Sequence, residues 1–540
     1  MSSDRTPSGN NRKPADGGAG PGSVFGRVPF HPVLFAVYPV LALLAANTGQ
    51  VLPSDGLRMF LLSVILAAAL YVAAWLFLRR IDQAAILASF TLLLVLSYGR
   101  VYDGMKAVGL SGTSIVRHRY LLPVVLLLPV VVLLVLRRFR PKGTTPYLNL
   151  VAACACLLPS AVLVASGLKQ FSARPASAAA ACELSPAPGK PRPDIYLIIM
   201  DAYERDDVLK RLHGYDNSPF LDGLRSMGFY VAPGSLSNYR HTELSLSSLL
   251  NMEYIQSYPD VLVDGKYNQW AIIQMINDNR VRRDLECIGY RTVAVETGAF
   301  WTEWTDADFF LRRRGGPLGA VGLLGGTTRF EAQFLETTMA RAVLDGLKSS
   351  SGSQAQALSP AAEARDLILF QFDELDRIAS LPSPKLVFIH VLAPHPPFLF
   401  GPGGEPVDIG AFDTGRSAGM SEGEELTAYA NQVTYLNGRL LEAMHDVLRA
   451  SPVDPIIIIQ GDHGWADQDY EDKLSILNAY HFPGQGQSVL YPTITPINSF
   501  RLLFDTYLGA HLETLPDRSY FSTEVDEYNF IPVANSWKGD

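Results

Sequence analysis

The first third of the chain is dominated by long apolar runs that contain few polar residues. Each run approaches the roughly 20 residues that an α-helix needs to cross a bilayer, and membrane helices can accommodate the prolines inside them. Buried core helices are a poor alternative, because five such segments in succession leave almost no polar face. The pattern therefore predicts five membrane helices, at residues 32–52, 59–78, 84–102, 119–137 and 146–167.

Basic residues between these segments predict their orientation, because loops rich in Lys and Arg stay on the cytoplasmic side. Three basic stretches must share one side: the N-terminal arm, the loop after the second segment and the loop after the fourth. Their basic residues are Arg5, Arg12, Lys13, Arg27, Arg79, Arg80, Arg137, Arg138, Arg140 and Lys142. The opposite loop is also basic, with Arg100, Lys106, Arg117 and Arg119. Because the first set is larger, we expect a multi-pass inner-membrane protein whose chain lies outside the cytoplasm after about residue 168.

Composition divides the chain further. Residues 1–28 are rich in Gly, Ser, Pro and charge, which predicts a disordered cytoplasmic arm. Because this arm lacks the pattern of a secretory leader, we expect no removable signal peptide. The Ser-, Ala- and Pro-rich residues 168–193 predict a linker. It would join a membrane domain at 29–167 to an extracytoplasmic domain at 194–540.

The remaining two-thirds of the chain alternates short apolar runs with stretches of helical period. The runs predict strands that are apolar on both faces, which is typical of a sheet covered by helices on both sides. These strands are Ile195–Met200, Arg291–Glu296, Leu386–Val391 and Pro455–Gln460. In such folds, sites form beyond the carboxyl ends of the strands. Here those ends carry Asp201, His395 and the pair Asp462–His463.

Other compositional features narrow the function without defining it. The formal charge of −8 gives no support to nucleic-acid binding. The glycine-rich residues 314–326 are not followed by Gly-Lys-Ser/Thr, so we interpret them as an apolar loop, and residues 348–362 as a flexible insertion. Cys154 and Cys156 lie in an apolar run. An extracytoplasmic location would allow a disulfide between Cys182 and Cys287, although sequence cannot show their separation.

Two strand ends carry residues that are typical metal ligands. Asp462 and His463 follow an apolar strand between two glycines and offer a carboxylate and an imidazole to the same ion. Zn²⁺ or Mn²⁺ accepts such mixed ligands. Asp201 closes another apolar strand and supplies a third donor. Each aspartate alone could instead cap the helix that follows it.

Thr242 lies where a polar turn leads into a Leu- and Ser-patterned helix. A hydroxyl in the first turn faces the positive end of the helix dipole. The simple alternative is that Thr242 is the N-cap of this helix. Ligation to a metal would instead make it a nucleophile, since a bound cation lowers the pKa of a coordinated oxygen.

The order of these motifs resembles the sulfatase-like, alkaline phosphatase-type superfamily, over about residues 30–515. It is most similar to lipoteichoic acid synthases and phosphoethanolamine transferases, which have five membrane helices before an extracytoplasmic catalytic domain. The resemblance implies a mixed, helix-covered sheet with a divalent metal, Zn or Mn. The implied metal ligands are Asp201, Thr242, Asp462 and His463. Thr242 would be the nucleophile, and His395 would contact the transferred group or a second metal.

The chain also departs from these families. It has no Cys/Ser-x-Pro-x-Arg motif at Thr242, which disfavours sulfate ester hydrolysis. Phosphoethanolamine transferases have a further histidine after the Asp-His motif, and this chain has no clear counterpart of it. Lys473 and His481 are the candidates for its role. We expect His390 to be structural. An aromatic core patch is the preferred interpretation of Trp301 and Trp304, and a substrate pocket is the alternative.

These observations predict an enzyme that moves a phosphate-containing head group from a phospholipid donor to an envelope glycan or lipid acceptor through phospho-Thr242. Two other interpretations stay open. In one, water is the acceptor and the chain is a phosphodiesterase, a phosphatase or another sulfatase-like hydrolase. In the other, the domain binds an envelope polymer without turnover.

Overall fold

The computed structural model gives two compact units, which are described separately. The first contains residues 1–47, 53–163 and 333–344, and the second contains residues 48–52, 164–332 and 345–540. The structure describes residues 28–539 except 49–52, 108–116, 140, 142, 173–183, 187, 188, 190, 191, 259, 260, 264, 265, 314–328, 351–359, 408–419, 467, 468, 524, 525 and 527. The predicted arm and the glycine-rich segment therefore lie outside the described residues, apart from Val28 of the arm.

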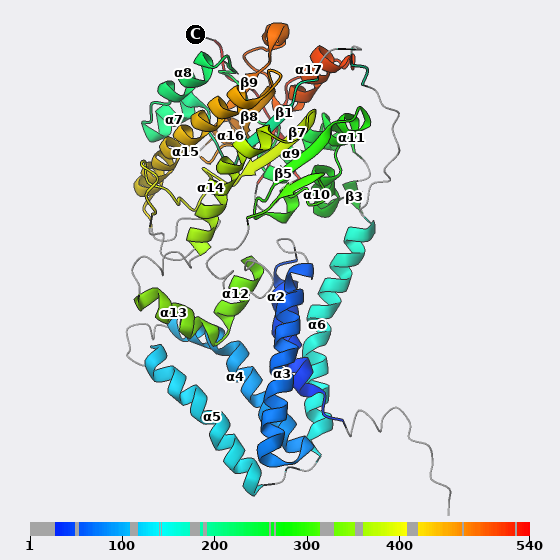
Figure 1. The fold of residues 1–540 in the computed structure, drawn as a ribbon, viewed down its shortest axis with the longest axis vertical. Coiled ribbons are helices and arrows are strands. Elements are labelled where there is room, and N and C mark those ends of the chain that lie inside the picture. The colour runs from blue at the N-terminus through cyan, green and yellow to red at the C-terminus, as the bar shows by residue number, and fades with distance from the viewer. Residues whose placement is uncertain are drawn as a thin grey trace, which may run out of the picture. The chain divides into compact units, whose positions relative to one another are not determined.

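The first unit is built on apolar helices (Figure 1). They are α2 (His31–Ala46), α3 (Leu57–Leu78), α4 (Ile81–Ala107), α5 (His118–Arg138) and α6 (Thr144–Ser172). Among the described residues, α3, α4, α5 and α6 are long and apolar enough to cross a membrane. The first predicted segment is a shorter helix of 16 residues, which ends where Asn47 bonds back to the carbonyls of Leu43 and Leu44.

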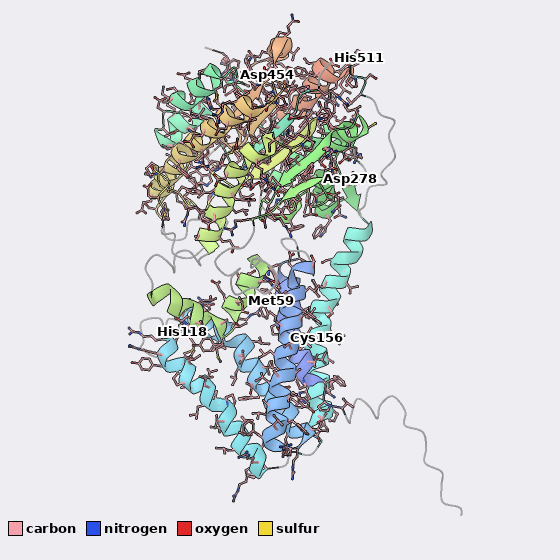
Figure 2. The ribbon with its side chains drawn as sticks, in the orientation of Figure 1. Met59, His118, Cys156, Asp278, Asp454 and His511 are labelled. Carbon is pink, nitrogen blue, oxygen red and sulfur yellow. The ribbon has the colours of Figure 1, made fainter. Side chains whose placement is uncertain are left out.

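A few buried polar contacts hold these helices together. The Asn149 side chain on α6 accepts hydrogen bonds from the backbone N–H groups of Phe30 (3.2 Å) and His31 (3.0 Å) at the start of α2. His31 Nδ1 lies 2.6 Å from Ser89 Oγ on α4. Cys156 lies on α6 (Figure 2), and its thiol, like that of Cys154, is free. Cys287 is disulfide-bonded, and residue 182 lies outside the described residues.

The first unit also contains a segment that is distant in sequence, residues 333–344. This segment consists of the end of α12 (Arg329–Thr337), the start of α13 (Ala340–Ser350) and the residues between them. The backbone N–H of Met339 donates to the carbonyl of Val95 at 2.8 Å. Arg341 pairs with Asp103 at 2.6 Å. Residues 333–344 therefore belong to the first unit, although the segments on either side of them belong to the second.

The second unit is an α/β domain whose main sheet is mixed, as predicted. The strand order is β2-β9-β8-β1-β7-β5-β6. Strands β8, β1, β7, β5 and β6 are parallel, whereas β9 pairs antiparallel with β8 and with β2. The strands are β1 (Ile195–Met200), β2 (Tyr230–Val231), β5 (Arg291–Val295), β6 (Phe309–Leu311), β7 (Lys385–Val391), β8 (Ile456–Gly461) and β9 (Asn478–His481).

Two small hairpins complete the strands of the described chain, β3 (Leu262–Val263) with β4 (Lys266–Tyr267) and β10 (Ser519–Phe521) with β11 (Ile531–Val533). The remaining helices of the unit are α7 (Asp206–His213), α8 (Ser218–Ser226), α9 (Thr242–Asn251), α10 (Gln269–Asn277), α11 (Arg280–Cys287), α14 (Pro360–Ala379), α15 (Glu422–Ala450), α16 (Tyr470–Leu474) and α17 (Pro496–Leu508).

Helices cover both faces of the main sheet (Figure 1), which explains why its central strands are apolar throughout. Along β1, Tyr196, Ile198 and Met200 pack into a core formed with α7, α8, α14 and α15. Ile195, Leu197 and Ile199 pack into the opposite core with α9, α11 and α17. All six residues of β1 are buried. The sheet is therefore fixed from both sides, and its carboxyl edge offers a rigid base for the site.

Candidate metal centre

Three adjacent strands bring the predicted site residues to one edge of the sheet. β1 lies between β8 and β7 in parallel register, with Met200 opposite both Gly461 and Val391. The connections that follow these strands are joined directly, since Asp201 N–H donates to the Val391 carbonyl and His395 N–H donates to the Asp201 carbonyl, each at 2.9 Å. The positions of the loops are therefore determined by the strand register.

Asp201, Asp462 and His463 form a buried group of donors. One potential ligand atom from each lies within 4.8 Å of the others. His463 Nε2 is 3.7 Å from Asp201 Oδ1 and 3.5 Å from Asp462 Oδ2. Those two carboxylate oxygens are buried and have no hydrogen-bond partner among the described residues. Buried oxygens of this kind require a partner, and a divalent cation would satisfy both.

The electrostatics of the cluster fit a metal. Burial, reinforced by the charge of Asp462, raises the pKa of Asp201 well above its usual range. Burial also acts to raise the pKa of Asp462, but the neighbouring His463 and His390 outweigh it and lower that pKa. Burial lowers the pKa of His463 to about 3. The site therefore offers a neutral imidazole and two carboxyl groups, a donor set that suits Zn²⁺ or Mn²⁺.

Hydrogen bonds orient two of these ligands. His463 Nδ1 faces the Gly464 carbonyl at 2.8 Å, so this nitrogen donates and Nε2 keeps its lone pair toward the carboxylates. Asp462 Oδ1 accepts from the N–H groups of Ala202 (3.0 Å) and His463 (2.9 Å). These bonds leave Oδ2 as the oxygen that faces the cluster. Ala202 adopts a left-handed conformation with φ of 60°.

Thr242 lies beside this group, at the start of the helix α9. It is the first residue of α9, and its Oγ1 lies 3.3 Å from His463 Nε2. The N-cap of this helix is His241, so the alternative interpretation of Thr242 as the N-cap is wrong. The hydroxyl is at the positive end of the α9 dipole and beside a candidate metal ligand, a position that suits a nucleophile.

His395 is near the cluster but outside the three-residue donor group. Its ring centroid lies 6.3 Å from that of His463. Its Nδ1 donates to the Pro396 carbonyl at 2.7 Å, which leaves Nε2 as the hydrogen-accepting nitrogen. Burial lowers the pKa of His395, so the ring is neutral. His395 can therefore accept a proton or a hydrogen bond.

The other candidates named from sequence have different positions. His390 is fully buried, with Nδ1 3.1 Å from Thr302 Oγ1 and Nε2 3.7 Å from Asp201 Oδ2. Lys473 reaches the Trp465 carbonyl (3.3 Å) beside the cluster, whereas His481 bonds to the Pro455 carbonyl at the amino end of β8. Of these two, only Lys473 lies near the site.

Trp301 and Trp304 lie in different environments. Trp304 is a core residue with no exposed surface that stacks on Phe388 at 4.5 Å, as the aromatic-core interpretation predicts. Trp301 is partly buried and makes an edge contact with Phe300.

Two residues of α15 that belong to no recognisable motif form hydrogen bonds with the backbone of the site loops. Tyr429 OH donates to the Ala202 carbonyl at 2.8 Å. Gln432 donates to the Pro394 carbonyl (3.1 Å) and accepts from Leu399 N–H (2.7 Å). Both side chains are completely buried. The only sequence indication was that polar residues occupy the apolar face of an amphipathic helix.

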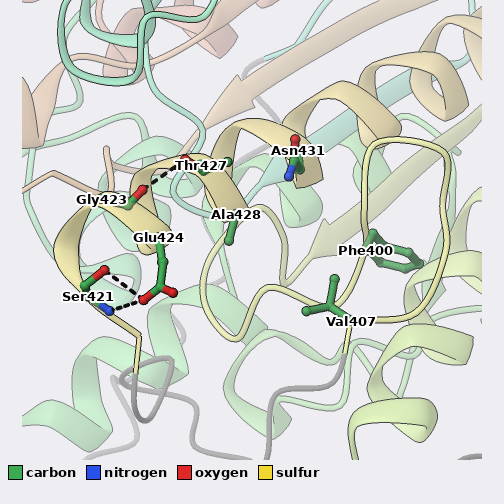
Figure 3. A pocket seen from close by; sticks show the side chains of 8 residues that line it. All are labelled: Phe400, Val407, Ser421, Gly423, Glu424, Thr427, Ala428 and Asn431. Atoms are coloured by element: carbon green, nitrogen blue, oxygen red, sulfur yellow. Dashed lines mark hydrogen bonds between the residues drawn. The ribbon is translucent and has the colours of Figure 1, made fainter.

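A cavity of about 410 Å³ lies against the first turns of α15 (Figure 3). It is lined by Phe400, Val407, Ser421, Gly423, Glu424, Thr427, Ala428 and Asn431. None of these residues belongs to the metal-ligand group, and Glu424 and Ser421 already satisfy each other in a capping box. The cavity is therefore not the chemical site.

Comparison with known proteins gives structural likeness only. No protein-family model matches the chain, and no curated protein sequence matches it. The C-terminal periplasmic domain of EcEptC from Escherichia coli is 14% identical, and the match covers 65% of this chain and 95% of that one with a TM-score of 0.39. The integral membrane protein lipooligosaccharide phosphoethanolamine transferase A from Neisseria meningitidis is 11% identical, with 88% and 96% covered and a TM-score of 0.39.

A third similar structure is the lipoteichoic acid synthase LtaP from Listeria monocytogenes, at 14% identity, with 59% and 71% covered and a TM-score of 0.34. The identities and TM-scores are low, so these likenesses carry no conclusion about the function of this chain.

Proposed function

We propose that this chain is a metal-dependent phosphotransferase that moves a phosphate-containing lipid head group to an envelope acceptor through phospho-Thr242. The observation that carries the proposal is the position of the Thr242 hydroxyl, 3.3 Å from His463 Nε2. That nitrogen belongs to a buried group with Asp201 and Asp462 whose facing oxygens lack partners among the described residues.

Asp201, Asp462, His463 and Thr242 would hold the metal. When bound, a divalent ion supplies a Lewis acid that favours the ionised hydroxyl and the charge developing on phosphoryl oxygens. Thr242 Oγ attacks phosphorus, the Oγ–P bond forms, and the bond from phosphorus to the diacylglycerol oxygen breaks. The departing oxygen takes up one proton, which balances the proton that the Thr242 hydroxyl loses. The substituted phosphoryl group then remains on Thr242.

In the second step an acceptor hydroxyl attacks phosphorus, and the Oγ–P bond breaks to restore the Thr242 hydroxyl. The neutral ring of His395 presents Nε2 as a hydrogen acceptor beside the cluster. His395 can therefore contact the transferred group or receive the proton of the acceptor hydroxyl. If water takes the place of that hydroxyl, the same residues perform hydrolysis.

The apolar helices support a lipid donor. Four described helices are long and apolar enough to cross a membrane, and tethering the site to the bilayer raises the local concentration of lipid substrate. In this proposal the α/β domain lies outside the cytoplasm of a cell whose inner membrane holds α2 to α6. The donor is a phospholipid, and the acceptor is a glycan or lipid of the envelope.

The test is the intact mass of the purified full-length protein after incubation with a phospholipid extract and Zn²⁺ or Mn²⁺. The wild type is expected to gain the mass of a phosphorylated head group, and Thr242→Ala is expected to gain nothing. Thr434→Ala, which removes an exposed threonine of α15, is the matched control and should gain the same mass as the wild type.

Two other results distinguish the remaining interpretations. Release of a free head group without an adduct would indicate water as the acceptor. Bound metal with neither adduct nor turnover of a phosphodiester would contradict catalysis and favour binding of an envelope polymer.

A further inference from the structure

A buried pair of ionisable side chains lies next to the loops that carry the candidate metal ligands. Glu204 follows Asp201 by three residues, and His213 is the last residue of α7. His213 Nε2 is 2.7 Å from Glu204 Oε2, and both side chains are completely inaccessible to solvent. Neither residue has a role in the proposed chemistry, so the cost of burying this pair calls for an explanation.

The facing polar atoms of the pair all have hydrogen-bond partners. His213 Nε2 faces the Glu204 carboxylate, and Nδ1 faces the backbone carbonyl of Leu426 at 3.2 Å. A carbonyl can only accept, so Nδ1 carries a hydrogen. The other carboxylate oxygen of Glu204 accepts from Ala466 N–H at 2.7 Å. This geometry suits a charge-assisted hydrogen bond between the two side chains.

Aromatic side chains surround the His213 ring. The His213 ring stacks on Tyr429 with centroids 4.6 Å apart, and the Trp465 ring lies 5.7 Å away. Aromatic faces attract a cation in a desolvated site. The environment of the pair is therefore suited to hold a positive charge next to the metal-ligand loops.

Glu204 bridges the two loops that carry the metal ligands. Its chain position fixes it to the loop of Asp201, and its bond to Ala466 N–H fixes it to the loop of Asp462 and His463. Its own N–H donates to Tyr429 OH at 3.1 Å, and that hydroxyl donates to the Ala202 carbonyl. Ala202 N–H in turn bonds to Asp462 Oδ1. These bonds form a closed network around the ligands.

We propose that Glu204 and His213 are positioning residues, which hold the two ligand loops at the separation that the metal requires and thereby set the metal affinity. The inference rests on the metal centre of the proposed function. It predicts that replacing either residue weakens metal binding more than breaking an equally buried pair elsewhere. Residues that position the ligands commonly change metal affinity about 10- to 100-fold.

The chain offers a matched control for the loss of a buried ion pair. Lys385 pairs with Asp194, and their side chains are 0% and 3% exposed. Both residues lie at the amino ends of β1 and β7, at the edge of the sheet opposite to the metal ligands. Lys385→Met should therefore destabilise the fold without changing the metal site.

The experiment measures Zn²⁺ affinity of the full-length protein by competition with a chromogenic chelator. The Co²⁺ absorption spectrum reports the ligand geometry. Glu204→Gln keeps the shape and removes the charge, and His213→Phe keeps the ring without its hydrogen bonds. Both are expected to weaken Zn²⁺ binding about 10- to 100-fold and to change the Co²⁺ spectrum. The double variant should lose no more affinity than the worse single variant, because both changes break one interaction.

Lys385→Met should bind Zn²⁺ like the wild type even where its melting temperature falls equally. Variants of Glu204 and His213 that keep wild-type affinity and spectrum would show that the pair acts only on stability and would overturn the inference alone. A wild-type protein that takes up no Zn²⁺, Mn²⁺ or Co²⁺ would overturn the metal centre, and this inference with it.

Discussion

Asp201 and Asp462 belong to one buried cluster, yet their pKa values shift in opposite directions. Burial dominates at Asp201 and raises its pKa, whereas at Asp462 the neighbouring histidines outweigh burial and lower the pKa. Asp462 also accepts two backbone hydrogen bonds, which stabilise its charge. Without metal, Asp462 is therefore the stronger acid of the pair, and Asp201 is the weaker acid.

This difference predicts how the metal-free protein responds to pH. The pKa of Asp201 is raised in the folded state, so its contribution to stability is present below the unfolded pKa and is lost as pH rises through the folded pKa. After chelation with EDTA, the melting temperature should fall as pH increases across that range. Bound Zn²⁺ should remove the fall, because it replaces the proton of Asp201.

Asp201→Asn is the control for this titration, since the amide keeps the shape and cannot ionise. Its metal-free melting curve should lose the pH-dependent fall attributed to position 201. The same fall in Asp201→Asn and in the wild type would assign the effect to another group.

Thr242 supplies the second residue prediction. Thr242→Val keeps the volume and removes the hydroxyl, so turnover of a soluble phosphodiester should fall on the order of 10⁴-fold. Thr242→Ser keeps the hydroxyl at the start of α9 and should retain measurable turnover. Both variants should still bind Zn²⁺, because Asp201, Asp462 and His463 remain. Turnover by Thr242→Val at the wild-type rate would exclude this residue as nucleophile.

The central strands of the sheet were easier to predict from sequence than the edge strands. β1, β7 and β8 were located within one residue, because strands buried on both faces have continuous apolar sequences. Edge strands such as β2 and β6 have only 2 or 3 residues and leave no such pattern.

The candidate ligands Asp201, Asp462 and His463 could be proposed from sequence for the same reason, since they follow continuous apolar strands. The pair of Glu204 and His213 was not, because its contact depends on α7 folding back over the Asp201 loop. Neither residue belongs to a motif, and a spacing of nine residues across a turn and a helix predicts no contact. The role of α15 was hidden in the same way, because a polar residue on an amphipathic helix gives no indication of what it contacts.

Glycines at the strand ends lead to a prediction about the loops themselves. A Cβ at Gly461 would lie 2.5 Å from the Tyr203 carbonyl oxygen, which is backbone and cannot swing away. Gly461→Ala should therefore destabilise the fold by about 1–3 kcal/mol and displace the Asp462 loop, with weaker Zn²⁺ binding. Denaturant unfolding and chelator competition measure the two effects.

Gly438→Ala is the matched control, because a Cβ there meets nothing within 4 Å on the exposed side of α15. It should stabilise the protein by about 0.4–1 kcal/mol and leave Zn²⁺ affinity unchanged. Equal metal affinity in the two variants would show that the close packing at Gly461 does not control the ligand loop.

The whole chain combines a helical unit with an α/β unit, but the two are not separated by one boundary in sequence. Residues 333–344 return to the helical unit, where Arg341 pairs with Asp103 near the end of α4. Gly99 of α4 is packed so closely against the backbone of Glu336 that a Cβ would not fit. Apolar runs could not predict this return, because the segment is short and amphipathic.

The basic loops predict the topology of the chain. Loops rich in Lys and Arg stay in the cytoplasm, and Arg79 and Arg80 lie in the loop before α4. The proposed transfer to an envelope acceptor requires the α/β domain to lie outside the cytoplasm.

Cysteine labelling tests this arrangement. In intact spheroplasts, a membrane-impermeant maleimide should modify Asp454→Cys, an exposed position of the α/β domain (Figure 2), without lysis. Arg80→Cys, also exposed, should react only after lysis, because it lies in the loop before α4. The reverse pattern would place the domain in the cytoplasm, away from an envelope acceptor. It would refute the proposed transfer even if Thr242 accepted a phosphoryl group in detergent.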